Sequence, residues 1–194
     1  MSHYFAEDPA LPDDLRTFAY YYGNQKFMLT SNSGVFSPGH VDPATDLLLK
    51  TVPPLQGSLL DLGCGYGVIG IVLAKAFGLE ATLADVNRRA LDCAALNCRQ
   101  NDVAAQVVQS DGFAHIPGLF GCITLNPPIH AGKEVVYGLF AQAAQHLAPG
   151  GAFYVVMLEK HGAPSAARAL SALFGNCEIL YKKKGHRVMR CTKS

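Results

Sequence analysis

The chain has 194 residues, of which 49% are hydrophobic, and its formal net charge is +1 at pH 7. This length and apolar content suffice for one sizeable core, which excludes long disordered spans and favours a single domain. The near-neutral charge excludes nucleic-acid binding driven by bulk electrostatics, so any such surface must be a local basic cluster.

Residues 1–57 are predicted to form an N-terminal extension, and 58–194 the core of the same domain. Within the extension, 19–22 and 26–30 are expected to pair as a hairpin around Gly23-Asn24. A helix is expected over 42–50, with Asp42 as its N-terminal cap. The first eight residues have no basic region followed by an apolar run, as a secretion signal would.

From residue 58 onward, short apolar runs alternate with longer segments of helical spacing, which predicts a parallel sheet with crossover helices. Strands are expected over 58–62, 80–85, 105–109, 122–126, 152–158, 177–182 and 187–191. Helices are expected over 67–77, 88–100, 133–146 and 163–174. Pro149-Gly150-Gly151 is expected to be a turn.

The run Asp61-Leu62-Gly63-Cys64-Gly65-Tyr66-Gly67 lies where the first core strand turns into a helix. Glycines there expose backbone N–H groups to a ligand that approaches closely. Asp85 lies 20 residues after Gly65, at the end of the next strand, and is placed to accept hydrogen bonds from two ribose hydroxyls. A nucleotide-like ligand is predicted, although a dinucleotide or a tight turn without ligand also fits these glycines.

Two further acids favour a ligand that carries a positive charge and an adenine. Asp61 precedes the first glycine, where its carboxylate would attract a cation and repel a pyrophosphate. S-adenosylmethionine, with its amino group and sulfonium, fits this position. Asp111 follows the third strand and can accept from an adenine amine, although it is equally typical of a turn or a helix cap.

Asn126-Pro127-Pro128-Ile129 closes the fourth strand, and so lies at the same edge of the sheet as the glycines. The side-chain oxygen of Asn126 and the carbonyl of Pro127 can accept both N–H bonds of a planar amine. The prolines stiffen the loop and contribute no N–H groups. The sequence therefore predicts methyl transfer to an exocyclic amine by positioning, without a covalent enzyme intermediate or a metal.

These residues resemble class I S-adenosylmethionine-dependent methyltransferases of the small-domain type. The chain is similar to the catalytic half of bacterial enzymes that methylate guanine N2 in small-subunit ribosomal RNA. The matching segments are 34–37, 41–42, 47–49, 60–67, Asp85, 126–132 and 149–151. The resemblance implies an α/β fold with a Rossmann-like seven-stranded, mostly parallel sheet, helices on both faces and an antiparallel last strand.

The resemblance also implies roles for individual residues. The cofactor, S-adenosylmethionine, is expected to contact Asp61, Gly63, Cys64, Gly65, Gly67, Asp85, Val86, Asp111, Gly112 and Asn126. The target amine is expected at Asn126, Pro127, Pro128 and Ile129. Ile129 departs from the family, which usually has an aromatic residue there to stack on the base, so Tyr66, Phe36 or Tyr137 are candidates for a replacement ring.

The expected partner is ribosomal RNA or a ribosomal subunit, in a cytoplasmic protein without a membrane anchor; the sequence does not predict an oligomeric state. The noncatalytic N-terminal domain of the related RNA enzymes has no counterpart here, so docking falls to this domain or to a partner. Candidate RNA contacts, besides Phe36, are His130, Lys133, Lys182, Lys183, Lys184, His186, Arg187 and Arg190. A solvated turn with solubilising lysines explains the C-terminal cluster equally well.

Several alternatives stay open at this point. The Asn-Pro-Pro element is shared with enzymes that methylate adenine N6 or a protein glutamine, so a glutamine side chain or a small-molecule amine can also be the substrate. A nicotinamide-dependent oxidoreductase and a noncatalytic RNA-binding module are the alternatives of other classes. The six cysteines form neither a CxxC pair nor a zinc-type array, which predicts no metal and a reducing compartment.

Overall fold

The computed structural model describes residues 12–194, so the first eleven residues of the N-terminal extension lie outside the described part of the chain. Its centre is a seven-stranded sheet in the order β5-β4-β3-β6-β7-β9-β8. The strands are β3 (Ser58–Leu62), β4 (Glu80–Asp85), β5 (Ala105–Gln109), β6 (Phe120–Leu125), β7 (Leu147–Leu158), β8 (Glu178–Lys183) and β9 (His186–Thr192).

The sheet is mostly parallel. β3, β4, β5, β6 and β7 pair in parallel, whereas β9 runs antiparallel to both β7 and β8. The predicted Rossmann-like sheet with an antiparallel last strand is therefore confirmed. The strand bounds expected from the sequence are also confirmed to within one or two residues, except for β7.

β7 begins at Leu147, five residues earlier than expected. Leu147 pairs with Phe120 and Ala152 pairs with Cys122, so four residues of β7 oppose Gly121 alone. These four include Pro149-Gly150-Gly151, which forms an irregularity inside the strand and not a turn ahead of it. A Cβ added to Gly151 would lie 2.8–3.1 Å from three carbonyl oxygens, so glycine allows this close backbone approach.

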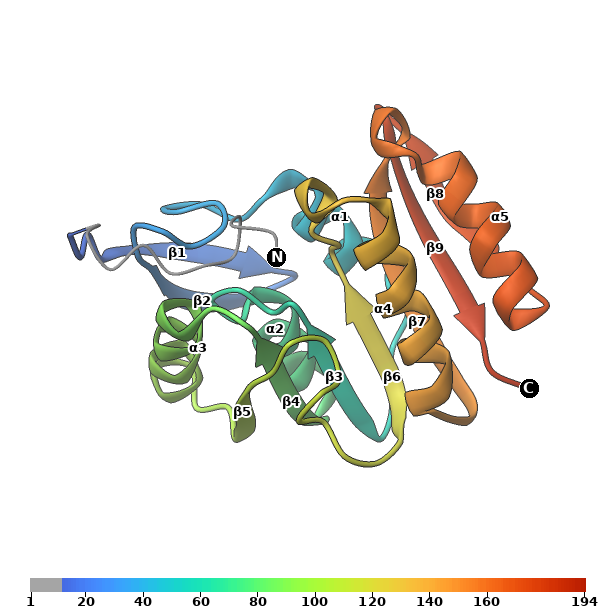
Figure 1. The fold of residues 1–194 in the computed structure, drawn as a ribbon. Helices are drawn as coiled ribbons and strands as arrows, with labels where there is room; N and C mark the ends of the chain where they lie inside the picture. Colours follow the sequence, from blue (N-terminus) through green and yellow to red (C-terminus); the bar gives the residue numbers. More distant parts are fainter. Residues whose placement is uncertain (1–11) are drawn as a thin grey trace.

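Helices cover both faces of the sheet because side chains alternate along the strands. Leu60, Ile123 and Phe153 pack with α4 (Lys133–His146) and α5 (Ala163–Phe174). On the opposite face, Leu59 and Leu83 pack with α1 (Pro43–Thr51), α2 (Val68–Phe77) and α3 (Arg88–Gln100). Figure 1 shows α4 in front of the sheet and α1 and α2 behind it.

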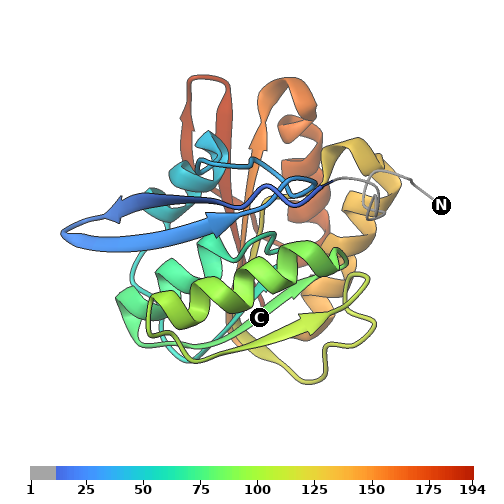
Figure 2. The same cartoon turned by 90° about the vertical axis from the view of Figure 1, so that its left-hand side faces the viewer.

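The N-terminal strands β1 (Arg16–Tyr22) and β2 (Gln25–Ser31) form the predicted hairpin, which is a separate two-stranded sheet. It extends across one side of the molecule next to α3 (Figure 2). The backbone of β2 pairs with two buried asparagines of α3. Asn97 accepts from the N–H of Thr30 and donates to its carbonyl, and Asn101 does the same at Met28, all at 2.7–2.9 Å.

These asparagines stand in for a neighbouring strand, so the edge of β2 that faces α3 has its polar groups paired. Asn97 also donates to the carbonyl of Tyr66 at 2.9 Å, which ties the hairpin to the turn before α2. Within residues 12–194, no helix has the length and apolar character required to cross a membrane.

Candidate active site

The glycine loop between β3 and α2 has a backbone that only glycine adopts easily. Gly63, Gly65 and Gly67 have φ values of +64°, +56° and +89°. The N–H of Cys64 donates to the carbonyl of Ala84 at 2.9 Å, which fixes the loop to β4. A Cβ on Gly65 would meet no atom within 4 Å, so the loop faces open space where a ligand can approach its backbone.

Asp61 lies beneath this loop and faces inward. Asp61 is only 1% exposed, and its carboxylate accepts hydrogen bonds from the N–H of Gly70 at 2.8 Å and from the hydroxyl of Thr124 at 3.0 Å. Burial raises the pKa of Asp61 from its ordinary 3.8 to about 7, against the effect of these two hydrogen bonds. The carboxylate holds α2 to β6, and its contact with a cationic ligand stays a prediction.

Asp85 connects the glycine loop to α3 at the end of β4. One oxygen accepts from the N–H of Gly65 at 2.8 Å and the other from the N–H of Asn87 at 2.9 Å. Burial raises the pKa of Asp85, and its backbone hydrogen bonds lower it. Because each carboxylate oxygen has further lone pairs, Asp85 can still accept from ribose hydroxyls beside Gly65.

The remaining predicted cofactor residues lie at the carboxyl ends of β4 and β5. Val86 is 38% exposed, Asp111 is exposed, and Gly112 is half-buried with a φ of +53°. The structure thus gathers the glycine loop, Asp85 and Asp111 along one edge of the sheet, at the ends of three neighbouring strands. A ligand with an amino-acid part, a ribose and an adenine fits such an edge.

Asn126 follows β6 on the other side of the glycine loop. Its side-chain nitrogen donates to Asp42 Oδ2 at 3.1 Å and to Thr45 Oγ1 at 3.0 Å, both at the start of α1. No residue between 12 and 194 donates to its side-chain oxygen, and that oxygen is not buried. The same range provides no hydrogen bond to the carbonyl of the buried Pro127. Two acceptors at neighbouring positions therefore have no hydrogen-bond donor among residues 12–194.

Beyond the prolines, the chain makes a 3₁₀ turn, η1 (Ile129–Ala131), and then enters α4. Ile129 is half-buried and lines a small pocket of about 120 Å³ together with Lys133, Tyr137, Met157 and His161. His161 belongs to the 3₁₀ turn η2 (Glu159–His161), which follows β7. The pocket lies between the ends of β6 and β7, next to the Asn-Pro-Pro loop.

The three candidate rings differ in accessibility. Tyr66 is 3% exposed and its hydroxyl donates to the carbonyl of His40 at 2.7 Å, so its ring is not available for stacking. Tyr137 is half-buried and stacks on Phe140, with ring centroids 5.4 Å apart. Phe36 is 62% exposed and lies in the 33–40 loop that precedes α1.

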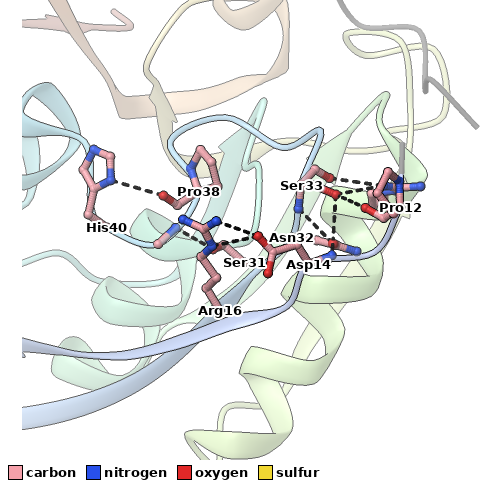
Figure 3. A network of polar contacts seen from close by, with 10 residues as sticks. Pro12, Asp14, Arg16, Ser31, Asn32, Ser33, Pro38 and His40 are labelled. Atoms are coloured by element: carbon pink, nitrogen blue, oxygen red, sulfur yellow. Dashed lines mark hydrogen bonds and ion pairs between the residues drawn. The ribbon is translucent and has the colours of Figure 1, made fainter. Parts of the chain in front are cut away.

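The 33–40 loop is held near both ends, and Figure 3 shows the contacts at Ser33 and at His40. The N–H of Gly39 donates to Ser31 Oγ at 2.7 Å, and Asn32 accepts from the N–H of Asp14 at 2.9 Å. Asn87 donates to the carbonyl of Gly34 at 3.1 Å. One end of the loop therefore contacts Asn87, beside the predicted cofactor edge. The other end leads to Asp42, which contacts Asn126. Phe36 is positioned between these two anchor points in the sequence.

The basic candidates separate into two groups. Lys133, Lys182, Lys183 and Lys184 are exposed, and none of them forms an ion pair with any residue between 12 and 194. Arg187 is 9% exposed and pairs with Glu159 at 2.7 Å, and Arg190 pairs with Glu178. The structure therefore separates Arg187 from the exposed lysines with which it was grouped.

The contacts that Asn126 makes with the start of α1 were not predicted from the sequence. Asp42 was expected only as a helix cap, a role that it does have, since its carboxylate accepts from the N–H groups of Ala44 and Thr45. Its contact with Asn126 joins positions 84 residues apart. No cluster of three or more metal-binding side chains occurs within residues 12–194.

Comparison with known proteins identifies the family of the chain. The chain is 38% identical over 197 residues to the uncharacterized protein YbxB of Bacillus subtilis, with 98% of both chains covered. It is 40% identical over 139 residues to the ribosomal RNA small subunit methyltransferase C of Aeromonas hydrophila, which covers 69% of this chain and 41% of that protein. The matched region thus spans less than half the length of this methyltransferase.

Among solved structures, the Thermus thermophilus 16S rRNA N2 G1207 methyltransferase, in complex with AdoMet and guanosine, matches with a TM-score of 0.86. The identity is 28%, and the match covers 97% of this chain and 53% of the other. The predicted cofactor, S-adenosylmethionine, is confirmed as that of the family. Since the methyltransferase small domain model matches residues 26–190, the chain belongs to the methyltransferase small domain family.

Proposed function

We propose that this protein transfers a methyl group from S-adenosylmethionine to an exocyclic amine, and that the amine is N2 of a guanine in ribosomal RNA. The observation that carries the proposal is that two neighbouring acceptors next to the glycine loop, Asn126 Oδ1 and the Pro127 carbonyl, have no donor among residues 12–194. A planar NH2 group has two N–H bonds in one plane, and two neighbouring acceptors can hold both.

Holding both N–H bonds fixes the direction in which the amine nitrogen faces. The nitrogen of an exocyclic amine is a weak nucleophile because its lone pair is delocalised into the ring, so precise aim matters more than basicity. The cofactor supplies the methyl group on a sulfonium. The protein contributes positioning, and the methylated nitrogen loses its proton to water, without a basic side chain.

The residues along the sheet edge fit this cofactor. The backbone of Gly63 and Gly65 would lie against its amino-acid part, Asp85 would accept from the ribose hydroxyls, and Asp111 would accept from the adenine amine. Val86 and Gly112 would border the adenine. These assignments follow from accessible glycine backbone and from the two carboxylates at successive strand ends.

A nucleobase is favoured over a smaller amine by the named relatives. The relative from Aeromonas hydrophila is named as a ribosomal RNA methyltransferase, and the structural neighbour holds guanosine. A base in structured RNA must be flipped out to reach such a site. Phe36 is well suited to cover it, because its exposed ring lies on the anchored 33–40 loop, while Ile129 offers an aliphatic face.

RNA docking is proposed for the basic turn, which we define as Lys182, Lys183 and Lys184. The turn between β8 and β9 lies at the substrate edge, because His186 pairs with Leu158, the last residue of β7. The N–H of Glu159 also donates to the carbonyl of Gly185 at 2.8 Å, which brings η2 next to the turn. Phosphate contacts there would be independent of base sequence and sensitive to salt.

The test is methyl transfer from tritiated S-adenosylmethionine to 16S ribosomal RNA and to small ribosomal subunits from cells that lack the gene. Mass spectrometry of the digested nucleosides would identify N2-methylguanosine if the proposal holds. Asn126→Ala is expected to abolish transfer while S-adenosylmethionine still raises the melting temperature. Transfer to a glutamine peptide or to N6 of adenine, with no N2-methylguanosine, would refute the guanine assignment.

Assays on the same protein preparation distinguish the proposal from the alternatives of other functional classes. Membership of the methyltransferase family leaves no support for a nicotinamide-dependent oxidoreductase. A noncatalytic RNA-binding module would bind RNA equally well in the wild type and in Asn126→Ala, and would incorporate no methyl groups in either. A ribosomal RNA substrate would place the protein in the cytoplasm.

A further inference from the structure

The amide of Asn126 is held from behind by the first turn of α1. Its nitrogen donates to Asp42 Oδ2 at 3.1 Å and to Thr45 Oγ1 at 3.0 Å, so both of its N–H bonds are in use. Thr45 is 7% exposed, and the same Asp42 oxygen accepts from the backbone N–H groups of Ala44 and Thr45. The partner of the amide is therefore itself fixed by the helix cap.

This arrangement determines which way the amide faces. A carboxylate has no proton to donate, so the atom of Asn126 next to Asp42 must be the nitrogen. The side-chain oxygen then points away from α1, toward the side where no residue between 12 and 194 donates to it. A flipped amide would present its NH2 group to an incoming NH2 group, which places donor against donor.

We propose that Asp42 and Thr45 are positioning residues for methyl transfer, which lock the Asn126 amide with its oxygen toward the target amine. The inference rests on the proposed function, because it assigns the open oxygen to an amine that donates. The charge of Asp42 also polarises the amide, since a hydrogen bond given to an anion makes the carbonyl oxygen a stronger acceptor. A site locked this way accepts from an NH2 group and rejects a base edge that carries only acceptors.

Four substitutions separate this role from the capping of α1. Asp42→Asn keeps the size of the side chain and remains a good N-cap, but its own amide can either accept or donate. It therefore no longer dictates the orientation of Asn126. Asp42→Ser also caps the helix but is too short to reach Asn126. Thr45→Val removes the hydroxyl without changing the shape, and Thr45→Ser restores it.

A matched control lies on the same helix. Asp46 is one turn from Asp42 and accepts hydrogen bonds from the hydroxyl of Tyr20 at 2.9 Å and from Lys50 at 2.7 Å. No hydrogen bond connects Asp46 to Asn126 among the residues that the structure describes. Asp46→Asn removes one negative charge from the start of α1 and leaves the amide lock unchanged.

The first measurement needs neither cofactor nor substrate. In a ¹⁵N-labelled protein, the side-chain NH2 signal of Asn126 is identified by its absence in Asn126→Ala. In the wild type, its protons should exchange with water more slowly than those of Asn24, which lies in the exposed hairpin turn. Asp42→Asn and Thr45→Val should shift this signal and speed its exchange, whereas Thr45→Ser and Asp46→Asn should not.

The second measurement is steady-state methylation. Asp42→Asn and Thr45→Val should lower kcat by about 10- to 100-fold, the size of loss expected when a reacting group is misplaced. The KM for S-adenosylmethionine and the melting temperature should stay at wild-type values. Thr45→Ser should recover most of kcat, and Asp46→Asn should match the wild type.

The outcomes distinguish this inference from the function on which it rests. An active wild type whose Thr45→Val and Asp42→Asn variants keep both kcat and the Asn126 signal would overturn the positioning role alone. A loss of kcat that follows the melting temperature, or that appears equally in Asp46→Asn, would also overturn it. A wild-type protein that methylates no amine would instead overturn the proposed function, whatever the amide signal does.

Discussion

Replacing Asp61 with asparagine is expected to stabilise the protein at and above neutral pH. Asp61 is 1% exposed and accepts from the N–H of Gly70 and the hydroxyl of Thr124. Asparagine can keep both contacts: its oxygen accepts from Gly70, and its nitrogen donates to Thr124. The Thr124 hydroxyl can then turn to the carbonyl of Leu60, which already lies 3.5 Å away.

The size of the effect follows from the two proton affinities of Asp61. Its pKa is about 7 in the folded protein, against an ordinary 3.8. The folded state therefore holds the proton more tightly, and this contribution to the free energy of unfolding is fully present below about pH 4 and is lost as pH rises through about 7. The proton affinity of Asp61 thus differs by about three factors of ten between the folded and unfolded states. At about 1.4 kcal/mol for each factor, the contribution to the free energy of unfolding is at most about 4 kcal/mol.

Asparagine has no proton to lose, so the variant avoids this loss. Its free energy of unfolding relative to wild type should rise from pH 5 to pH 8 by about 2–3 kcal/mol. Urea unfolding followed by circular dichroism at pH 5, 6, 7 and 8 measures the difference. As a control, Asp61→Ala removes both acceptors and should destabilise the protein at every pH. A difference between Asp61→Asn and wild type that stays constant from pH 5 to 8 would refute the reasoning.

Three other measurements test separate parts of the structure. Asn97→Ala should lower the free energy of unfolding by about 3 kcal/mol in urea, because a fully buried amide with three backbone partners is lost. Binding of S-adenosylmethionine at pH 7 should release a fraction of a proton from Asp61 if the cationic groups of the cofactor lie near it, since a nearby positive charge favours the carboxylate over the protonated form. Calorimetry in two buffers of different ionisation enthalpy would detect it, and equal heats would contradict it. The double variant Lys183→Gln, Lys184→Gln should reduce the slope of log affinity for RNA against log salt by about 1–2, as filter binding would measure; an unchanged slope would remove the basic turn from the interface.

Much of the core could be predicted from the sequence because its signals are local. Short apolar runs with turn residues between them define buried parallel strands, and helical spacing defines the segments that cross over. The carboxyl ends of parallel strands share one edge, so the ends of β3, β4 and β6 could be expected near one another without coordinates. This is why Asp61, Asp85 and Asn126 were grouped correctly at one edge.

The direction of individual side chains was not predictable in this way. The burial of Asp61 was not expected: strand alternation and the start of α2 enclose its carboxylate, and its contact with a ligand stays a prediction. Arg187 follows three lysines closely in sequence and was grouped with them. Like Lys182 and Lys183 it lies on a strand, where successive side chains point to opposite faces, and the sequence does not show which face is buried. Its own face is the one that meets Glu159.

Contacts between polar residues that are distant in the sequence could not be predicted either. Asn97 and Asn101 occupy helix positions four residues apart, which predicts a shared face but not that this face is buried against β2. Polar residues on a helix are usually solvated, and nothing local distinguishes these two. Their partners lie 67 and 73 residues away. The link from Asp42 to Asn126 has the same character.

These distant contacts change the status of the N-terminal extension. A boundary at residue 57 separates it from the glycine loop, from Asp85 and Asp111 and from the Asn-Pro-Pro loop, which makes it look accessory. Yet the family match begins at residue 26 and includes β2 and α1. β2 is joined to the glycine loop through Asn97, which also binds the carbonyl of Tyr66. α1 supplies the carboxylate and hydroxyl that hold the Asn126 amide. The motif residues alone therefore define where the chemistry can occur, while residues before 58 determine the orientation of the one side chain that would receive the amine.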